Sequence, residues 1–190
     1  IQVYLDNTNH GTINPSFGDF TIYGGLYRDV SLITVAENHF DMMYYGTQGL
    51  LIQTDVNDHV GQVNITPKVI LNKNGHTPHI VYEIRDSTKT LVYAQTGCIN
   101  EKTTLTIENV CLWDGLENAS LYFLNARLIC DDIEYDRVEL PFGFRTIHLS
   151  PETGFYLNGK SLFLRGVAKH QDYDNRYCAT TVKNNLMTFN

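Results

Sequence analysis

The residues best suited to chemistry lie together near the C-terminal end of the sequence. Lys169, His170, Gln171 and Asp172 are consecutive, and Asp174 follows two positions later. An imidazole can donate or accept a hydrogen bond and ordinarily titrates near neutrality, so His170 is the strongest single candidate for binding or proton transfer. Asp172 is placed either to bind a ligand or to orient the loop. The cluster predicts a polar binding loop.

An apolar hairpin precedes this cluster and must position it. Two apolar runs, 155–157 and 162–164, flank Asn158-Gly159, a pair that tolerates the positive φ angles of a tight turn. The second run leads through Arg165-Gly166 into the polar residues, and we expect Arg165 to order this region through buried hydrogen bonds. Barrel enzymes present their chemistry in this way, at the C-terminal ends of strands. A surface hairpin followed by a polar loop fits the same pattern and remains the alternative.

This stretch carries a resemblance to a known family. The pattern L-N-G-K-x-L-F-L-R-G-V-x-x-H-x-D, residues 157–172, resembles the entry into the catalytic barrel of glycoside hydrolase family 2, the group of β-galactosidases, β-glucuronidases and β-mannosidases. The resemblance is greatest to the β-galactosidases. It implies that His170 hydrogen-bonds the sugar and helps to stabilise the transition state. Ala168-Lys169 departs from many members of the family, which weakens any assignment of a specific sugar.

A second motif lies near the N-terminus. D-F-T-x-Y-G-G-L-Y-R-D-V, residues 19–30, resembles the end of the family's jelly-roll sugar-binding domain, and its glycine pair would let the backbone turn sharply or approach another group closely. The resemblance implies that Asp29 contacts the sugar's hydroxyls, directly or through a bound cation. It makes a cation such as Na⁺ or Mg²⁺ the candidate cofactor of the parent enzyme. No cofactor is expected within this chain. A plain salt bridge of Arg28 or Asp29 to a neighbour is the alternative.

Between these motifs, short strand-like runs recur at regular spacing. Pro67 indicates an edge strand or a bulge, and Trp113 is expected to hold a loop onto the strands. Seven short strands over about a hundred residues predict an immunoglobulin-like β-sandwich. The candidate strands are 49–55, 62–71, 79–85, 89–94, 103–110, 120–130 and 135–140.

The predicted fold class is mainly β, in three parts. Residues 1–38 are expected to be the C-terminal end of a jelly-roll sugar-binding domain, and residues 39–141 the sandwich. Residues 142–190 begin with F-G-F-R-x-I, which resembles the family's linking strand, and are expected to start a truncated (β/α)8 barrel. The i, i+4, i+7 spacing of Val182, Leu186 and Phe189 predicts the first helix of that barrel. Segments 1–35 and 154–190 are expected to expose apolar surface, and either to pack on the sandwich or to mediate association between chains.

Charge and composition restrict the partners. The net charge is −7, the pI is near 5.4 and no cluster of Lys and Arg is present, which argues against nucleic acid or an anionic membrane surface as a partner. No apolar run approaches the ~20 residues of a membrane span. The first residue is Ile1, which suggests an internal fragment of a longer protein; the compartment stays open. The four cysteines show no CxxC spacing and are expected to be free thiols, mostly buried.

A retaining glycosidase needs two carboxylates about 5–5.5 Å apart. Asp131-Asp132 is expected to form a solvated turn, and nothing identifies Asp172 and Asp174 as the catalytic pair. The resemblance places the catalytic glutamates beyond Asn190. Two histidines, His76 and His79, have a spacing attributed to chance rather than to zinc.

The predicted function is therefore that of a fragment of a retaining glycoside hydrolase that acts on terminal β-linked sugars, most like β-galactosides. The fragment itself is expected to be inactive, with His170, Asp29 and Asp172 as substrate-binding residues. The expected partners are the carbohydrate, the jelly-roll and barrel portions of the same protein, and a second copy in a homo-oligomer. A non-catalytic carbohydrate- or protein-binding β-sandwich module is the alternative.

Overall fold

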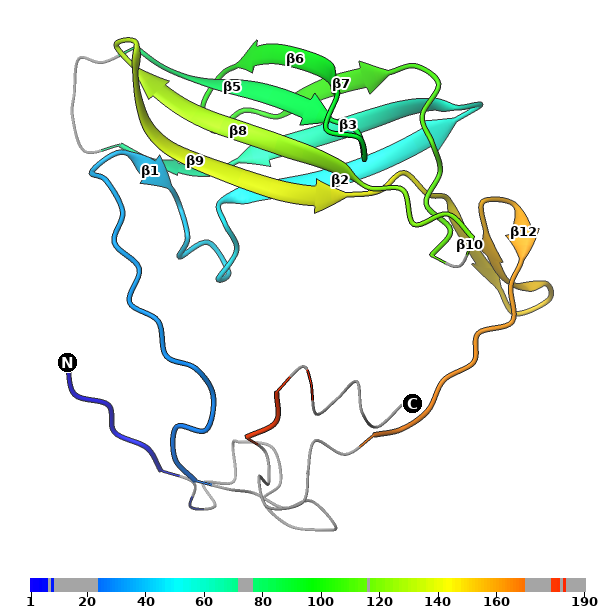
Figure 1. Ribbon diagram of the computed structural model, residues 1–190, viewed down its shortest axis with the longest axis horizontal. Coiled ribbons are helices and arrows are strands. Elements are labelled where there is room, and N and C mark those ends of the chain that lie inside the picture. Colours follow the sequence, from blue (N-terminus) through cyan, green and yellow to red (C-terminus); the bar gives the residue numbers. More distant parts are fainter. Residues whose placement is uncertain are drawn as a thin grey trace. The chain divides into compact units, whose positions relative to one another are not determined.

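The computed structural model describes residues 1–6, 8, 24–71, 77–115, 117–169, 179–181 and 183. The chain divides into two compact units. One is Thr34–Leu164, and the other combines Ile1–Ile33 with Arg165–Asn190, so both ends of the chain belong to the same unit. Figure 1 traces the chain through both. No helix among the described residues is long and apolar enough to cross a membrane.

Two antiparallel sheets dominate the Thr34–Leu164 unit (Figure 1). One has the strand order β2-β3-β7 and the other the order β6-β5-β8-β9. Two small sheets accompany them, β1-β4 and β10-β11-β12. The strands are β1 His39–Phe40, β2 Leu50–Asn57, β3 Val60–Pro67, β4 Val69–Ile70, β5 Pro78–Arg85, β6 Leu91–Gly97, β7 Thr103–Ile107, β8 Tyr122–Cys130, β9 Ile133–Phe142, β10 Ile147–Ser150, β11 Gly154–Leu157 and β12 Lys160–Ser161.

The core lies between the two larger sheets. Alternate residues of each strand point inward because side chains in an extended chain alternate between faces. Val63 and Ile65 of β3 are fully buried, as are Leu124 and Leu128 of β8. One contiguous apolar cluster joins both sheets. The predicted immunoglobulin-like sandwich is thus confirmed.

Each of the seven predicted strands has a counterpart in the structure. The predicted run 62–71 divides into β3 and β4, with Pro67 as the last residue of β3. β3 is the middle strand of its sheet, yet β7 pairs with it only from Gly61 to Ile65. Pro67 therefore lies beyond the residues that pair with β7. Because no strand lies beside its nitrogen there, its lack of an N–H costs no hydrogen bond between strands.

Residues 162–164, predicted as the first barrel strand, form no strand in this structure, and the barrel itself stays a prediction. The hairpin strand that pairs with β11 is Lys160–Ser161, and only one further backbone bond continues it, from Leu162 N to Phe155 O at 3.0 Å. Phe163 is 82% exposed. A barrel strand is hydrogen-bonded along both edges, and the described residues supply no neighbouring strand to this run. The predicted helix from Val182 falls almost wholly outside the described residues.

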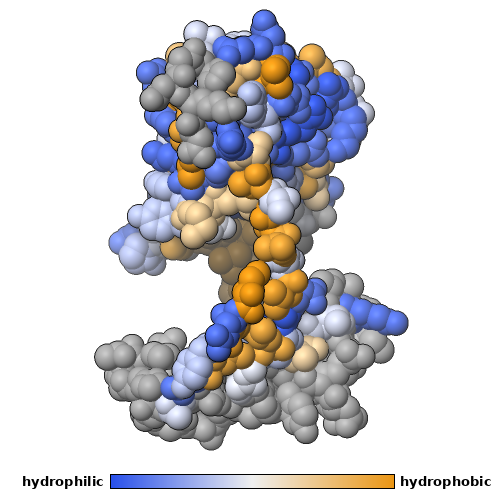
Figure 2. Space-filling view, turned by 90° about the vertical axis from the view of Figure 1, so that its left-hand side faces the viewer, coloured by the Kyte–Doolittle hydropathy of each residue, from blue (hydrophilic) through white to orange (hydrophobic). Residues whose placement is uncertain are grey.

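The two chain ends expose apolar side chains, as expected. Between Leu26 and Val35, the large apolar residues have exposed fractions from 46% to 79%, and Figure 2 shows uncovered hydrophobic side chains along this segment. Val167 is 76% exposed in the C-terminal segment. The described residues 24–38 form no strand.

The cysteine prediction is only partly correct. Cys98, Cys111 and Cys130 are free thiols, but Cys98 and Cys111 are exposed and only Cys130 is buried. Cys130 faces inward at the end of β8, and burial raises the pKa of its thiol. Cys98 and Cys111 lie just after β6 and β7, in connections that the two sheets do not cover. Cys178 lies outside the described residues.

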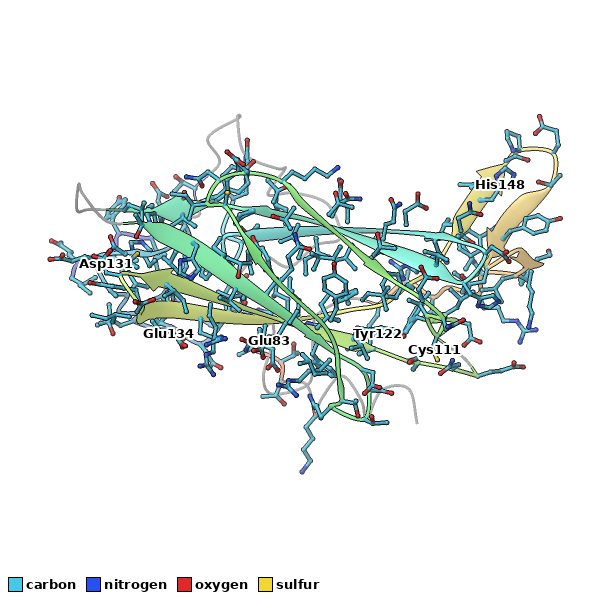
Figure 3. The ribbon with its side chains drawn as sticks, turned by 90° about the horizontal axis from the view of Figure 1, so that it is seen from above. Glu83, Cys111, Tyr122, Asp131, Glu134 and His148 are labelled. Atoms are coloured by element: carbon cyan, nitrogen blue, oxygen red, sulfur yellow. The ribbon has the colours of Figure 1, made fainter. Side chains whose placement is uncertain are left out.

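The outer face of the four-stranded sheet carries a network of ion pairs. Arg127 lies between Glu83 and Glu134, at 3.3 Å and 3.6 Å, and Arg85 and Arg137 each pair with one of these glutamates. Figure 3 labels Glu83 and Glu134 on this sheet. These partly exposed pairs each stabilise the fold only weakly, by about 0–1 kcal/mol. They keep a broad polar surface over the core.

Tyr82 of β5 makes stability depend on alkaline pH. The residue is 0% exposed, and its hydroxyl has no hydrogen-bond partner among the described residues. Burial raises the pKa of Tyr82 from 10.0 to about 12, although the nearby Thr103 hydroxyl opposes this. The unfolded chain therefore ionises Tyr82 near its ordinary pKa and the folded chain only at higher pH. Its contribution to stability is complete below that ordinary pKa and is lost as the pH rises through the folded value.

We predict that the wild-type chain loses up to about 3 kcal/mol of unfolding free energy through this residue between about pH 10 and 12. Tyr82→Phe should remove that part of the alkaline loss, as measured by urea unfolding at a series of pH values. Tyr93→Phe is the control, because Tyr93 is only half-buried and its hydroxyl donates to Gln95 Oε1 at 3.1 Å. Identical pH profiles for wild type and Tyr82→Phe would contradict the prediction.

Candidate functional site

Asp29 is the one predicted substrate-binding residue that the structure describes. It lies in the exposed segment 24–33, four residues after Gly25. Gly25 has a φ of 106°, in the region that favours glycine, and the chain bends there. No atom lies within 4 Å of a Cβ added at Gly25, so of the two alternatives the turn fits and the close approach does not. The carboxylate of Asp29 makes no hydrogen bond or ion pair with any other described residue. It is therefore available to a ligand.

His170 and Asp172 lie outside the described residues, as does Asp174. Their segment, Arg165–Asn190, belongs to the same unit as the N-terminal segment that carries Asp29. Arg165, which begins the segment, is exposed rather than buried, so the prediction that it makes buried hydrogen bonds is wrong. A guanidinium can remain buried only with several acceptors around it, and none of the described residues supplies one.

The hairpin that leads to this segment has the predicted turn. Asn158 and Gly159 join β11 to β12 and have φ angles of 51° and 75°. Positive φ at both central residues is the signature of a type I′ turn, whose twist matches that of antiparallel strands. β11 also pairs with β10 along its whole length, from Ile147↔Leu157 to Ser150↔Gly154. The Asn-Gly pair thus fixes the strand register of this small sheet.

Asn158 also ties the hairpin to the sandwich. Its side-chain Oδ1 accepts a hydrogen bond from Thr146 N at 3.0 Å, and its backbone N donates to Thr146 O at 2.9 Å. Its Nδ2 donates to the backbone oxygen of Trp113 at 3.1 Å. One side chain therefore joins three segments, the turn, the strand that enters the hairpin and the loop after β7. We call Asn158, Thr146 and Trp113 the hairpin junction.

Trp113 holds its loop onto the sandwich, as predicted. Its backbone N donates to Phe144 O at 2.8 Å, next to a parallel bridge between Leu112 and Phe144. Its ring packs so closely on Gly115 and Gly143 that an added Cβ would come within 2.7 Å and 3.0 Å of Trp113 atoms. The two glycines are thus required for the ring to lie where it does.

A cavity of about 500 Å³ adjoins the hairpin junction. Apolar side chains from β2 and β9 line it, and Arg145 lies over the Trp113 ring with 4.9 Å between its guanidinium carbon and the ring centroid. Sequence reasoning missed this site. F-G-F-R-x-I suggested only a linking strand, although a single arginine after three alternating aromatic and glycine residues is a signal that a search for cation–π pairs could use.

The described carboxylates offer no catalytic pair. Asp131 and Asp132 form the exposed turn between β8 and β9, with φ angles of 50° and 62°, so the predicted solvated turn is confirmed. Glu83 and Glu134 are held by arginines on the outer sheet face. A general acid must carry a proton before it can donate one. A permanent cation beside a carboxyl group favours its ionised form, which carries no proton.

The described residues also do not form a cation site. No three His, Cys, Asp or Glu side chains come close enough among them to hold a metal ion. Asp29 alone cannot supply the several oxygen ligands that Na⁺, Mg²⁺ or Ca²⁺ require. His79 is the second residue of β5, and His76 lies outside the described residues.

Comparisons with known proteins connect these features to one family. The family description "Glycosyl hydrolases family 2" matches residues 48–145. A β-glucuronidase of Bacteroides fragilis is 33% identical over 182 residues, which cover 90% of this chain and 26% of that protein. A β-galactosidase of Thermoanaerobacterium thermosulfurigenes is 28% identical over 185 residues, which cover 91% of this chain and 24% of that protein. The chain thus spans about a quarter of the length of these relatives.

Solved structures agree on the fold. The structure of an FMN-binding β-glucuronidase from Faecalibacterium prausnitzii superposes with a TM-score of 0.86 at 30% identity, and the match covers 96% of this chain and 28% of that one. The matched region thus extends beyond the sandwich into both flanking segments.

The hairpin junction can be tested through Asn158. Asn158→Gly keeps the positive φ but removes two side-chain hydrogen bonds, and should cost about 1–2 kcal/mol of unfolding free energy. Asn158→Ala should cost about 1 kcal/mol more, because alanine is strained at positive φ. Urea unfolding followed by the fluorescence of Trp113, the sole tryptophan, measures both.

Asn109→Gly is the matched control. Asn109 also has a positive φ, 54°, but its side chain makes no hydrogen bond with the described residues, so this change should be nearly neutral. Equal losses for Asn109→Gly and Asn158→Gly would show that the junction bonds contribute nothing.

Proposed function

The chain belongs to family 2 of the glycosyl hydrolases, and from this membership we propose that it is the β-sandwich section, with both flanking segments, of a longer retaining β-glycosidase. The relatives it matches are about four times as long, which supports a longer parent protein. In this proposal the chain supplies part of the wall of a sugar-binding pocket. The catalytic carboxylates come from sequence outside it.

One observation carries the proposal. The segment with Asp29 and the segment with His170 and Asp172 stand at opposite ends of the chain, yet they belong to the same compact unit. The sandwich is the intervening unit, and its polar outer face and ion-paired carboxylates suit a scaffold. The sandwich would connect these two segments along the chain and would take no part in the catalytic reaction.

The proposed mechanism follows the chemistry of retaining glycosidases. One carboxylate attacks the anomeric carbon while the other protonates the leaving oxygen, and water then releases the sugar from the covalent intermediate. Asp29 would accept hydrogen bonds from sugar hydroxyls. His170 would donate to a hydroxyl whose charge changes in the transition state, and Asp172 would bind a hydroxyl or orient His170. These residues position the sugar, so that binding energy is used to orient the reacting bond.

The substrate that the comparisons favour is a β-glucuronide. The relative at 33% identity and the structure at TM-score 0.86 are both β-glucuronidases. A β-galactoside, the sugar expected from the motifs, is the second candidate, and relatives at 24% and 28% identity that carry this name support it. Both substrates share the terminal β-linked sugar.

We predict that the 190-residue chain alone hydrolyses neither 4-nitrophenyl β-D-glucuronide nor 4-nitrophenyl β-D-galactoside. Release of 4-nitrophenol, followed by absorbance over hours at high protein concentration, is the measurement. Turnover that co-purifies with the chain would contradict the claim that its catalytic carboxylates lie elsewhere. The longer parent polypeptide should hydrolyse one of the two substrates. A parent that binds these sugars without hydrolysing either would instead support the non-catalytic binding module.

In that longer polypeptide, Asp29→Asn and His170→Phe should each lower kcat/KM by about 10²–10³, because the first removes a charge and the second a hydrogen-bond donor that would face the sugar. Asp132→Asn is the matched control: Asp132 lies in an exposed turn that asparagine also tolerates, so its kcat/KM should stay at the wild-type value. Wild-type kinetics for Asp29→Asn would remove Asp29 from the pocket.

A further inference from the structure

The cavity beside the hairpin junction lies on an open side of the sandwich. β2 and β9 form two of its walls, and each is the edge strand of its sheet: β2 pairs only with β3, and β9 only with β8, among the described strands. Edge strands leave a row of backbone N–H and C=O groups unpaired. Extended polypeptide, unlike a compact small molecule, can use such a row.

The floor of the cavity continues the apolar core. Leu50 and Phe142 belong to the buried cluster and line the cavity, while Ile52 and Leu140 are partly exposed there. Leu50, Ile52 and Thr54 are alternate residues of β2, so all three project from the same face of the strand. An apolar side chain entering here would complete the packing between the two sheets.

The mouth of the cavity carries a single cation. Arg145 is exposed, its guanidinium lies over the Trp113 ring, and no carboxylate pairs with it in the described part of the chain. A guanidinium has five N–H donors, so it can pair with a carboxylate while it also contacts an aromatic ring. By contrast, Arg85, Arg127 and Arg137 are all paired with glutamates. In a chain of net charge −7, an unpaired arginine beside an apolar cavity marks a complementary, acidic partner.

The walls of the cavity are already formed. Gly143 O accepts a hydrogen bond from Thr54 Oγ1 at 3.3 Å, which links β2 to the end of β9. Trp113 is held by Phe144 O and Asn158 Nδ2 and packs on Gly115 and Gly143. A partner would therefore meet a preorganised surface and would pay little to order it.

We propose that this cavity docks an extended polypeptide segment with an apolar side chain next to an aspartate or glutamate. The apolar side chain enters between β2 and β9, and the carboxylate pairs with Arg145. The proposal concerns an interaction surface and does not depend on the substrate of the parent enzyme.

The test uses two peptides and the full 190-residue chain. The pentapeptide acetyl-TLDLT-amide is the probe, and acetyl-TLNLT-amide replaces its carboxylate by a neutral amide. The indole N–H signal of Trp113, the sole tryptophan, reports binding in ¹H–¹⁵N NMR titrations. The aspartate peptide should bind with a dissociation constant on the order of 1 mM, and the asparagine peptide about five- to tenfold more weakly.

Three variants test whether the charge of Arg145 and the width of the cavity control peptide binding. Arg145→Gln should abolish the difference between the peptides. Arg137→Gln, which alters an arginine already paired with Glu134, should preserve it. Leu121→Phe, which narrows the cavity from outside the core cluster, should weaken both peptides alike.

Three results would overturn the proposal. The first is equal binding of the two peptides to the wild-type chain. The second is an equal response of Trp113 to hexanoate, which would make the cavity a small-molecule site. The third is a Trp113 signal that moves with protein concentration alone, which would make a second copy the occupant.

Discussion

The structure depends on one buried aromatic ring, that of Phe144. It is 0% exposed and packs edge-on against Tyr122 and Phe142, with centroid separations of 5.1 Å and 5.5 Å. Gly61 of the opposite sheet gives it room: an added Cβ there would lie 2.5 Å from the Phe144 ring. Phe144 therefore anchors the chain at the point where it leaves the four-stranded sheet, and the contact spans both sheets of the sandwich.

The backbone of Phe144 then organises the end of the sandwich. Its oxygen accepts the Trp113 N–H, which fixes the loop after β7, and Trp113 in turn accepts a bond from Asn158. The chain from β9 to the hairpin is thus held at three points: the buried Phe144 ring, the hydrogen bond from Trp113 to Phe144, and the hydrogen bond from Asn158 to Trp113. A one-residue shift would remove Phe144 from its site and reverse which face of the hairpin is apolar. This constraint sets where the C-terminal segment departs.

The distribution of charge separates scaffold from surface. The arginines over the four-stranded sheet are neutralised by glutamates, so that face has little reason to attract a charged partner. The Arg145 cation remains unpaired beside an apolar cavity, and the Asp29 carboxylate remains unpaired in the other unit. Groups without internal partners are the ones available to bind something else. The proposed pocket wall and the proposed docking surface both rest on this difference.

The sequence alone determined the sandwich and the hairpin turn, because alternation of apolar residues and an Asn-Gly pair act over a few neighbouring positions. It also supplied Asp29, His170 and Asp172 by resemblance, and their roles stay predictions. It failed for Arg165, since a buried guanidinium needs acceptors that local sequence does not specify. The barrel strand expected at Leu162–Leu164 stays a prediction, since a strand needs hydrogen-bonding neighbours that the described residues do not supply. Only the tertiary structure decided three features: the cavity, the contact of Arg145 with the Trp113 ring, and the hydrogen bonds of Asn158 in the hairpin junction. Each brings together residues from separate strands and loops, and contacts of that kind have no local pattern.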